Sequence, residues 1–184
     1  MTNSQEFSFK ISIIGDGGVG KTSLIKKITK GTFEQDYIQT IGAQFSRYDI
    51  EIDGDIVNLI FWDIAGQDEF NFLHPLFYRD SKGGIIVFSL EDNDLGEESF
   101  NHIENWHNEL KKFCSDIPVV LFANKVDTIE EVNLIKTNIQ EVIRERKFLG
   151  HFLTSAKTGQ GVHEAFNTII EKLYNKNKAP ISEL

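Results

Sequence analysis

The sequence has very little cysteine and no long apolar run. Its one cysteine, Cys114, excludes an internal disulfide and favours a reducing compartment. No apolar stretch approaches the ~18 residues that a membrane-spanning helix needs. The first residues lack the apolar core of a signal peptide, Thr2 stands where myristoylation requires glycine, and the last residues offer no cysteine for prenylation. We therefore expect a cytoplasmic protein with no membrane anchor in this chain, recruited to membranes only through partners or a missing tail.

Basic residues are also fewer than acidic residues. Lysine and arginine number 19 against 28 aspartate and glutamate residues, which gives a formal net charge of -9 and a pI of about 5.0. Such a charge argues against non-specific attraction to nucleic acid or to anionic lipid, although a local basic patch is compatible with it. Internal repeats and low-complexity segments are absent from the sequence as well. The length of 184 residues predicts one domain over residues 1–184, with a core from about 7 to 175, short flexible ends and a monomeric state.

What the sequence does contain is an alternation of strand and helix patterns. Apolar residues alternate in FSFKISIIG (7–15), which predicts a strand, and TSLIKKITK (22–30) changes to helical spacing. Asp53-Gly54, between two further strand-like segments, predicts a β-hairpin. GGIIVFS (83–89) and IPVVLFA (117–123) are the continuous apolar runs of strands that are buried on both faces. Between these two runs, the apolar positions from Phe100 to Phe113 predict one helix.

The last third of the sequence continues this alternation. Thr128 and Glu131 have the spacing of a capping box that opens a helix, and HFLTSA (151–156) predicts a short strand. Apolar residues from Val162 to Leu173 recur at spacings of three and one, which predicts a final helix. The sequence therefore predicts an α/β sandwich. Its sheet would have six strands, mainly parallel with one antiparallel edge strand, helices on both faces and right-handed crossovers.

Four glycines occur in the eight residues GDGGVGKT (15–22), between the first strand and the first helix. Glycine allows positive φ and close approach to a ligand. In this setting the backbone N–H groups of Gly18, Val19 and Gly20 can surround a phosphate at the positive end of a helix. Lys21 would add a charge for the β- and γ-phosphates, and Thr22 would offer a hydroxyl to Mg²⁺. The alternative is a flexible glycine-rich turn.

The segment FWDIAGQ (61–67) ends the second strand of the hairpin. An acid at a strand end that faces a phosphate loop can hold Mg²⁺, which predicts Asp63 as a metal ligand. Gly66 would offer a backbone N–H to the γ-phosphate, and Gln67 would orient an attacking water. Taken alone, an acid such as Asp63 would more often be a solvated residue at a strand end. The presence of the phosphate loop favours the metal-ligand interpretation instead.

Two tetrapeptides, NKVD (124–127) and TSAK (154–157), each follow a predicted strand. A carboxylate can accept hydrogen bonds from guanine N1–H and from its 2-amino group, which adenine does not offer, so Asp127 is predicted to select guanine. The stem of Lys125 would lie over the purine, and the N–H of Ala156 would bind the guanine O6. Either tetrapeptide alone also fits an ordinary loop, whereas four motifs in order, each after a strand, argue against coincidence.

Together with YIQTIG (37–42), these motifs make the sequence resemble the small GTPases of the Ras superfamily over residues 7–175. The segments IGAQF, FWDIAGQDEF and FYRDS are most similar to Rab-type segments. The resemblance implies a P-loop NTPase fold and a switch that binds GTP or GDP with Mg²⁺. It further implies that Thr40 ligates Mg²⁺ and reaches the γ-phosphate, that Phe33 packs against the guanine, and that Tyr37 closes over the phosphates.

The motifs and the resemblance together define the candidate site. The catalytic candidates are Lys21, Thr40 and Gln67, and the candidate Mg²⁺ ligands are Thr22, Thr40 and Asp63. The nucleotide-binding candidates are Gly15, Gly17, Gly18, Val19, Gly20, Lys21, Thr22, Ser23, Phe33, Tyr37, Thr40, Gly66, Asn124, Lys125, Asp127, Ser155, Ala156 and Lys157.

Three features depart from the Rab pattern. Gly17 stands where many Rab proteins carry serine, and His74-Pro75 lies in the second switch segment. The sequence also lacks the terminal cysteines to which Rab proteins normally attach prenyl groups. Two interpretations stay open: the chain works without its own anchor, or a native tail has been trimmed.

The sequence therefore predicts a slow GTP hydrolase that acts as a switch in signalling or vesicle trafficking. Residues about 33–45 and 64–80 would contact effectors, an exchange factor and a GTPase-activating protein. The apolar cluster FNFLHPLFY (70–78) supports such contacts, with Phe70 and Leu73 as test positions. No arginine lies in FEQDYIQT (33–40), so a partner would have to supply one for fast hydrolysis. The alternatives are a guanine-nucleotide-binding scaffold with negligible hydrolysis and an ATP-using P-loop enzyme, which Asp127 disfavours.

Overall fold

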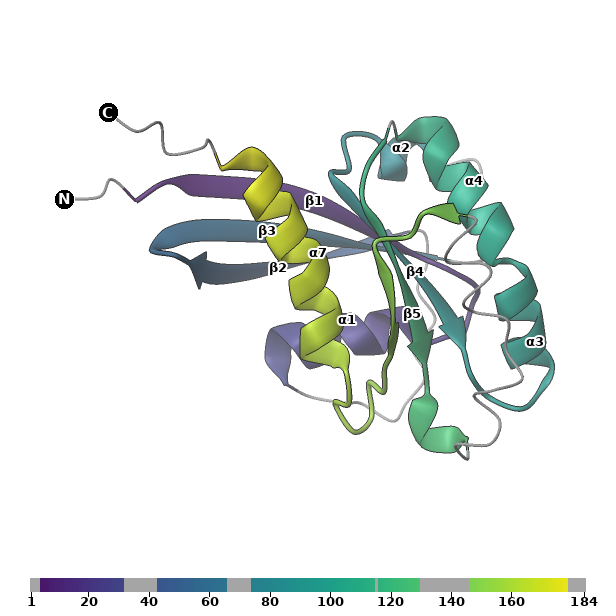
Figure 1. Cartoon of the computed structure of the whole chain (residues 1–184). Coiled ribbons are helices and arrows are strands. Elements are labelled where there is room, and N and C mark those ends of the chain that lie inside the picture. The colour runs from purple at the N-terminus through teal and green to yellow at the C-terminus, as the bar shows by residue number, and fades with distance from the viewer. Residues whose placement is uncertain (1–3, 32–42, 66–73, 115, 130–145, 179–184) are drawn as a thin grey trace.

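A computed structural model describes residues 4–31, 43–65, 74–114, 116–129 and 146–178 of the protein. Its centre is a six-stranded sheet in the order β2-β3-β1-β4-β5-β6 (Figure 1). The strands are β1 (Glu6–Ile14), β2 (Ala43–Ile52), β3 (Asp55–Ile64), β4 (Gly83–Ser89), β5 (Val119–Asn124) and β6 (Gly150–Leu153). The edge strand β2 pairs with β3 in antiparallel register, and the other neighbouring strands pair in parallel. The predicted sheet is confirmed.

The β2–β3 hairpin closes through the two residues that the sequence indicates. Asp53 has φ 52° and Gly54 has φ 83°, the positive values that the tight turns of hairpins require. Ile52 and Asp55 face each other directly across this turn. The hairpin therefore adds β2 to the sheet as an edge strand next to β3.

Helices cover both faces of the sheet, as predicted. They are α1 (Lys21–Lys30), α2 (His74–Tyr78), α3 (Asp94–Asn101), α4 (Ile103–Phe113), the 3₁₀ helix η2 (Val126–Thr128) and α7 (Val162–Asn177). The two faces carry separate hydrophobic clusters: Val87 of β4 packs with α1 and α7, whereas its neighbour Phe88 packs with α2 and α4. This alternation explains why β4 and β5 are apolar without interruption.

The helical segment between β4 and β5 differs from its prediction in two respects. It begins at Asp94, where the side chain of Asn93 caps the helix by accepting a hydrogen bond from the Gly96 N–H. It is also divided at His102 into α3 and α4, although backbone hydrogen bonds from His102 to Glu98 and from Trp106 to His102 carry the chain through the junction. The predicted capping box at Thr128 and Glu131, with the helix behind it, lies largely outside the described residues.

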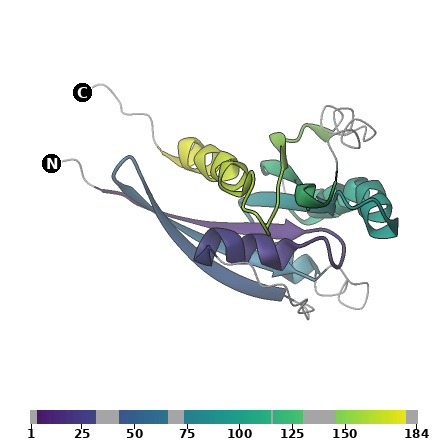
Figure 2. The same ribbon diagram turned by 90° about the horizontal axis from the view of Figure 1, so that it is seen from below.

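The end of the molecule that carries the hairpin turn also holds the start of β1 and the end of α7 (Figure 2). The hydroxyl of Tyr174 donates to the Asp55 carboxylate at 2.8 Å, and the Gln5 N–H donates to the other oxygen of that carboxylate, also at 2.8 Å. Regular structure thus extends from Glu6 to Asn177, slightly beyond the predicted core. In the part of the chain that the structure describes, no helix is both long and apolar enough to span a bilayer.

Candidate nucleotide-binding site

The loop between β1 and α1 is shaped by its glycines. Gly15, Gly18 and Gly20 have φ of 137°, 81° and 100°, values that side-chain-bearing residues rarely adopt. A Cβ on Gly15 would collide with the Val87 carbonyl, and one on Gly20 with the Asn124 amide. Gly20 is also the N-cap of α1 and places no side chain on the first N–H groups of that helix. The loop is therefore tightly fitted at the start of a helix rather than a loose turn, and a helix start of this kind is suited to an anion.

Lys21 lies buried behind this loop. Its ammonium group donates to the carbonyls of Gly15 and Asp16, both at 2.7 Å, and the residue is 6% exposed. Burial lowers the pKa of Lys21 to about 8, although the carboxylates of Asp63 and Asp16 act in the opposite direction. An anion beside the ammonium group would restore the charged form, so this lysine is suited to a phosphate.

Thr22 and Asp63 meet across the gap between α1 and the end of β3. The Thr22 hydroxyl donates to the Asp63 carboxylate, and Asp63 is 3% exposed. Asp63 is thus a buried acid next to the loop rather than a solvated one. A hydroxyl and a carboxylate are oxygen ligands of the kind that Mg²⁺ prefers, so the two side chains fit this ion.

Asn124, at the end of β5, connects two loops. Its amide N–H donates to the Val19 carbonyl at 2.8 Å, and its amide oxygen accepts from the Ala156 N–H at 3.3 Å. The Thr154 hydroxyl donates to the same oxygen at 3.3 Å. The residue is 1% exposed, so these hydrogen bonds hold the phosphate loop and the loop after β6 at fixed positions.

Asp127 lies in η2 beside the loop that follows β6. The Ser155 hydroxyl donates to one Asp127 carboxylate oxygen at 2.6 Å, and Lys157 Nζ is 3.8 Å from the other. Lys125 has a left-handed φ of 67°, and its ammonium group pairs with Glu91 at 2.6 Å. The structure therefore gathers the NKVD and TSAK segments at the same edge of the sheet as the phosphate loop.

Comparison with known proteins identifies the family. The model of the Ras family matches residues 10–175. The chain belongs to the Ras family. Ras-related protein Rab-21 of Bos taurus is 37% identical over 91% of this chain and 73% of its own length, and that of Homo sapiens is 36% identical over 91% and 72%. Ras-related protein Rab-13 of Mesocricetus auratus is 35% identical over 96% of this chain and 85% of its own length. This Ras-family protein is thus a Rab-like small GTPase, a GTP-binding protein of a class that hydrolyses GTP.

Several predicted site residues of this Ras-family protein lie outside the described residues. They are Phe33, Tyr37, Thr40, Gly66 and Gln67, and the same holds for Phe70 and Leu73 of the partner segment. The remaining candidates all lie along one edge of the sheet.

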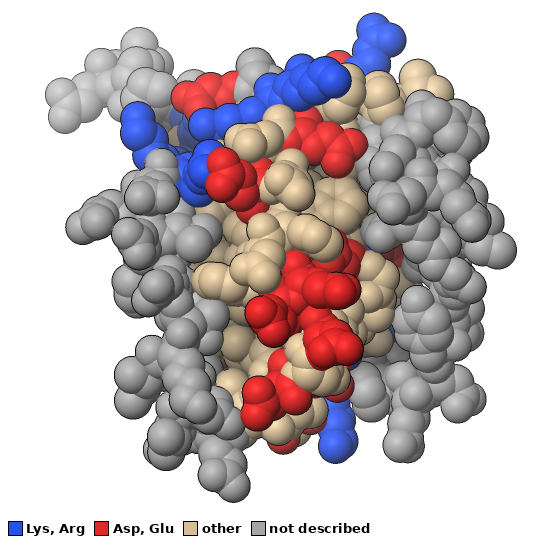
Figure 3. All heavy atoms as spheres, turned by 90° about the vertical axis from the view of Figure 1, so that its right-hand side faces the viewer, with Lys and Arg blue, Asp and Glu red and all other residues tan. Residues whose placement is uncertain are grey.

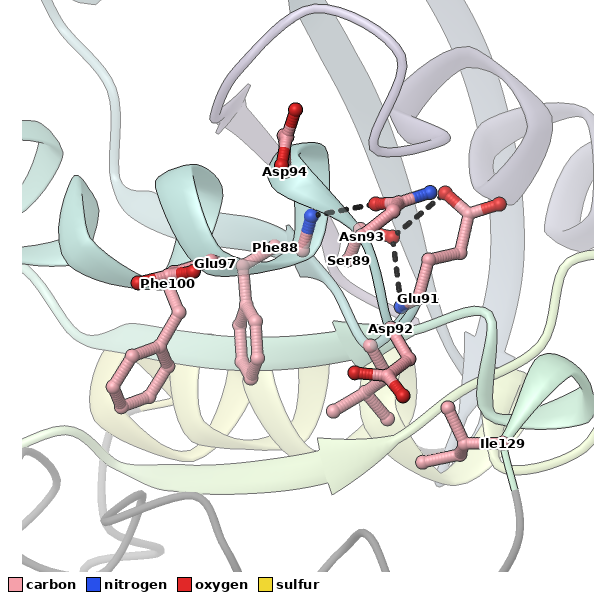
Figure 4. A pocket seen from close by; sticks show the side chains of 11 residues that line it. Phe88, Ser89, Glu91, Asp92, Asn93, Asp94, Glu97, Phe100 and Ile129 are labelled. Carbon is pink, nitrogen blue, oxygen red and sulfur yellow. Dashed lines mark hydrogen bonds between the residues drawn. The ribbon is translucent and has the colours of Figure 1, made fainter.

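Glu91, the partner of Lys125, is not among the site residues that the sequence predicts. The hydrogen bond and charge of Lys125 lower the pKa of Glu91, although burial raises it. Glu91 lines a pocket of about 330 Å³ between β4 and the start of α3, which Phe88, Phe100 and Ile129 also line (Figure 4). Its hydrogen bond with Ser89 holds the carboxylate at the rim of this pocket. No motif marks Glu91, because its partner is 34 residues away in the sequence.

Proposed function

We propose that this small GTPase is a switch that binds GTP or GDP with Mg²⁺, hydrolyses GTP slowly, and regulates signalling or vesicle trafficking through partners. The observation that carries the proposal is the position of Asn124, which joins the phosphate loop to the guanine-side loops in one buried network. A nucleotide is the ligand that requires a phosphate cradle and a base site at a fixed separation.

Asp127 selects guanine in this proposal. The Ser155 hydroxyl occupies one side of the carboxylate and orients it, and the side chain of Asp127 is 13% exposed. The carboxylate oxygens would accept the N1–H and the 2-amino group of guanine, and the backbone N–H of Ala156 would donate to O6. Adenine would leave these groups unpaired, which disfavours ATP.

Lys21 and the N–H groups at the start of α1 bind the phosphates. The pair Thr22 and Asp63 would hold Mg²⁺, which supplies charge neutralisation on the β- and γ-phosphates. Among the described residues, no cluster of three acidic, histidine or cysteine side chains could hold a metal ion alone. The ion would therefore depend on phosphate oxygens and on Thr40, so metal and nucleotide are expected to bind together.

Partners dock on residues about 33–45 and 64–80 in this proposal, and part of that surface is described. Phe45 is 74% exposed and its ring centroid lies 6.0 Å from that of Trp62, which is 5.9 Å from that of Phe77. Leu76, in α2, is 66% exposed. These apolar side chains include members of both segments, 33–45 and 64–80. A partner that docks on them would contact both segments at once and so respond to the bound nucleotide.

The slow rate follows from the absence of a suitable arginine. Lys21 and the metal would stabilise part of the charge that develops on the γ-phosphate, and Gln67 would orient the attacking water. Apart from its chain neighbours, a Cβ built on Gly17 meets no atom of the described residues within 4 Å, which leaves room beside that part of the loop for an arginine of a partner. Such a partner would accelerate hydrolysis.

Titration of the purified protein with fluorescent GDP, GTP and ATP analogues tests the binding step. We expect tight binding of the guanine nucleotides, weakened by removal of Mg²⁺ with a chelator, and much weaker binding of ATP. Equal affinity for ATP would refute the role of Asp127. Guanine-nucleotide binding without any hydrolysis would support the scaffold alternative instead.

A further inference from the structure

Asp16 of the phosphate loop is held by two side chains from the helices that follow β4. The indole N–H of Trp106, in α4, donates to one carboxylate oxygen of Asp16 at 2.6 Å. Nδ1 of His102, at the junction of α3 and α4, lies 2.8 Å from the other oxygen. Both oxygens are thus engaged, and the two contacts span 90 and 86 residues of sequence. The Asp16 side chain is 16% exposed, and the contact with Trp106 is partly shielded from water, whereas the His102 side chain is 47% exposed.

The backbone of Asp16 faces the nucleotide side of the same loop. Its carbonyl accepts a hydrogen bond from Lys21 Nζ at 2.7 Å, and the Gly15 carbonyl accepts the second. The ammonium group that would meet the phosphates is therefore oriented by the residue that Trp106 and His102 hold. Leu95 of α3 also lies close to the loop, because its Cδ2 is 3.4 Å from the place that a Cβ added to Gly18 would occupy.

We propose that Trp106 and His102 are positioning residues for the phosphate loop, acting through Asp16. They fix the loop backbone so that its carbonyls orient Lys21 and its N–H groups keep the cradle that the phosphates require. They also hold the Asp16 carboxylate at α4, hydrogen-bonded, so that its negative charge does not turn toward an anionic ligand. This inference rests on the proposed nucleotide-binding function.

The charge around these helices is a second reason to hold the Asp16 carboxylate. Acidic side chains gather on the face formed by α3 and α4 (Figure 3). The exposed acids of this region are Asp92, Asp94, Glu97, Glu98 and Glu104. The Asp16 carboxylate adds to this negative charge, and its hydrogen bonds with Trp106 and His102 compensate for it.

Dissociation of a fluorescent GDP analogue, chased with excess GDP in Mg²⁺, tests the proposal. Trp106→Phe keeps an aromatic ring and removes the N–H donor. We expect dissociation about tenfold faster, as for the loss of one hydrogen bond to a charged acceptor. His102→Ala should act in the same direction, and His102→Gln, which retains an N–H donor, should restore most of the wild-type rate. His163→Ala, at an exposed histidine of α7, is the matched control and should leave the rate unchanged.

A double-mutant cycle separates positioning from general support of the fold. In an Asp16→Ala background, Trp106→Phe should change the dissociation rate less than twofold, because its acceptor is gone. An unchanged rate for Trp106→Phe in the wild-type background, or a tenfold change in both backgrounds, would overturn the proposal. Circular dichroism at increasing temperature checks that each variant is folded. If the wild-type protein bound no GDP, the proposed function would fail, whereas binding without an effect of Trp106→Phe would reject the positioning role alone.

Discussion

The side-chain amide of Asn124 donates a hydrogen bond of 2.8 Å to the backbone carbonyl of Val19, 105 residues earlier in the chain. One buried side chain thereby joins the end of β5 to the middle of the phosphate loop. Because its amide oxygen accepts from the loop after β6, Asn124 also fixes the phosphate loop relative to that loop, as the proposed nucleotide site requires.

Asn124→Ala should destabilise the protein even without nucleotide. The substitution leaves the Val19 carbonyl and the Ala156 N–H without this partner, at a position that is 1% exposed. We expect the free energy of unfolding to fall by about 2–3 kcal/mol, together with a loss of GDP affinity. Urea denaturation measures the first effect and nucleotide titration the second. Asn101→Ala, at an exposed asparagine of α3, is the control, and equal losses in both variants would contradict the assigned role.

Asp127→Asn should weaken binding of guanine nucleotides selectively. The amide replaces one acceptor by a donor, which would face the N–H groups of guanine. We expect GTP affinity to fall by about 1–3 kcal/mol, the cost of leaving buried donors unpaired. Competition titration against a fluorescent GDP analogue gives this value. If GTP affinity stays the same, another group selects the base.

Local patterns predict the sheet, which the structure confirms, and a candidate site at the carboxyl ends of its strands. A strand buried on one face shows alternating apolar residues, as β1 does, and a strand buried on both faces shows an unbroken apolar run, as β4 and β5 do. Asp53-Gly54 predicts the hairpin because these residue types readily adopt the positive φ of its turn. Gly15–Thr22 and Asp63 were predicted as one site because parallel strands bring their carboxyl ends to the same edge.

Contacts between distant side chains could not be predicted in this way. Trp106 lies in the segment from Phe100 to Phe113 whose apolar spacing predicts a helix, and it is partly buried against the apolar side chains of α2 and α4, but its N–H binds Asp16. Neither its helical position nor its neighbours reveal that partner. The division into α3 and α4 at His102 likewise depends on local backbone conformation, which the spacing of apolar residues does not reveal.

Phe45→Ala should weaken contacts with partners without affecting the fold. Because Phe45 is 74% exposed, we expect the free energy of unfolding to change by no more than about 0.5 kcal/mol and nucleotide affinity to be unchanged. Quantitative capture of GTP-dependent binding proteins on immobilised protein should fall severalfold. Ile56→Ala, at a 48% exposed position near the hairpin turn, is the matched control. Equal capture by the two variants would place the docking surface elsewhere.

His107 should make stability fall in mild acid. Burial, with smaller contributions from Lys111 and Arg146, lowers the pKa of His107 from 6.5 to about 4. The unfolded chain therefore takes up a proton before the folded protein does, and stability is lost as the pH falls from about 6.5 toward 4. At pH 5 this loss should amount to about 2 kcal/mol.

Urea denaturation of His107→Leu and wild type at pH 7.5 and pH 5 isolates this contribution. The variant should lose about 2 kcal/mol less than the wild type between the two pH values. His163→Leu, at an exposed histidine, should behave like the wild type. Parallel pH dependence of all three proteins would show that His107 titrates normally in the folded state.

Single-turnover GTP hydrolysis by the purified protein with Mg²⁺ decides whether it is a slow guanine-nucleotide switch. We expect a rate on the order of 10⁻⁴ to 10⁻³ s⁻¹, comparable to unassisted Ras-type hydrolysis, because no arginine lies in residues 33–40. Gln67→Leu should remove most of that rate, and ATP in place of GTP should give no turnover above the buffer background. A wild-type rate near 1 s⁻¹, or hydrolysis of ATP as fast as that of GTP, would show that the protein is not such a switch.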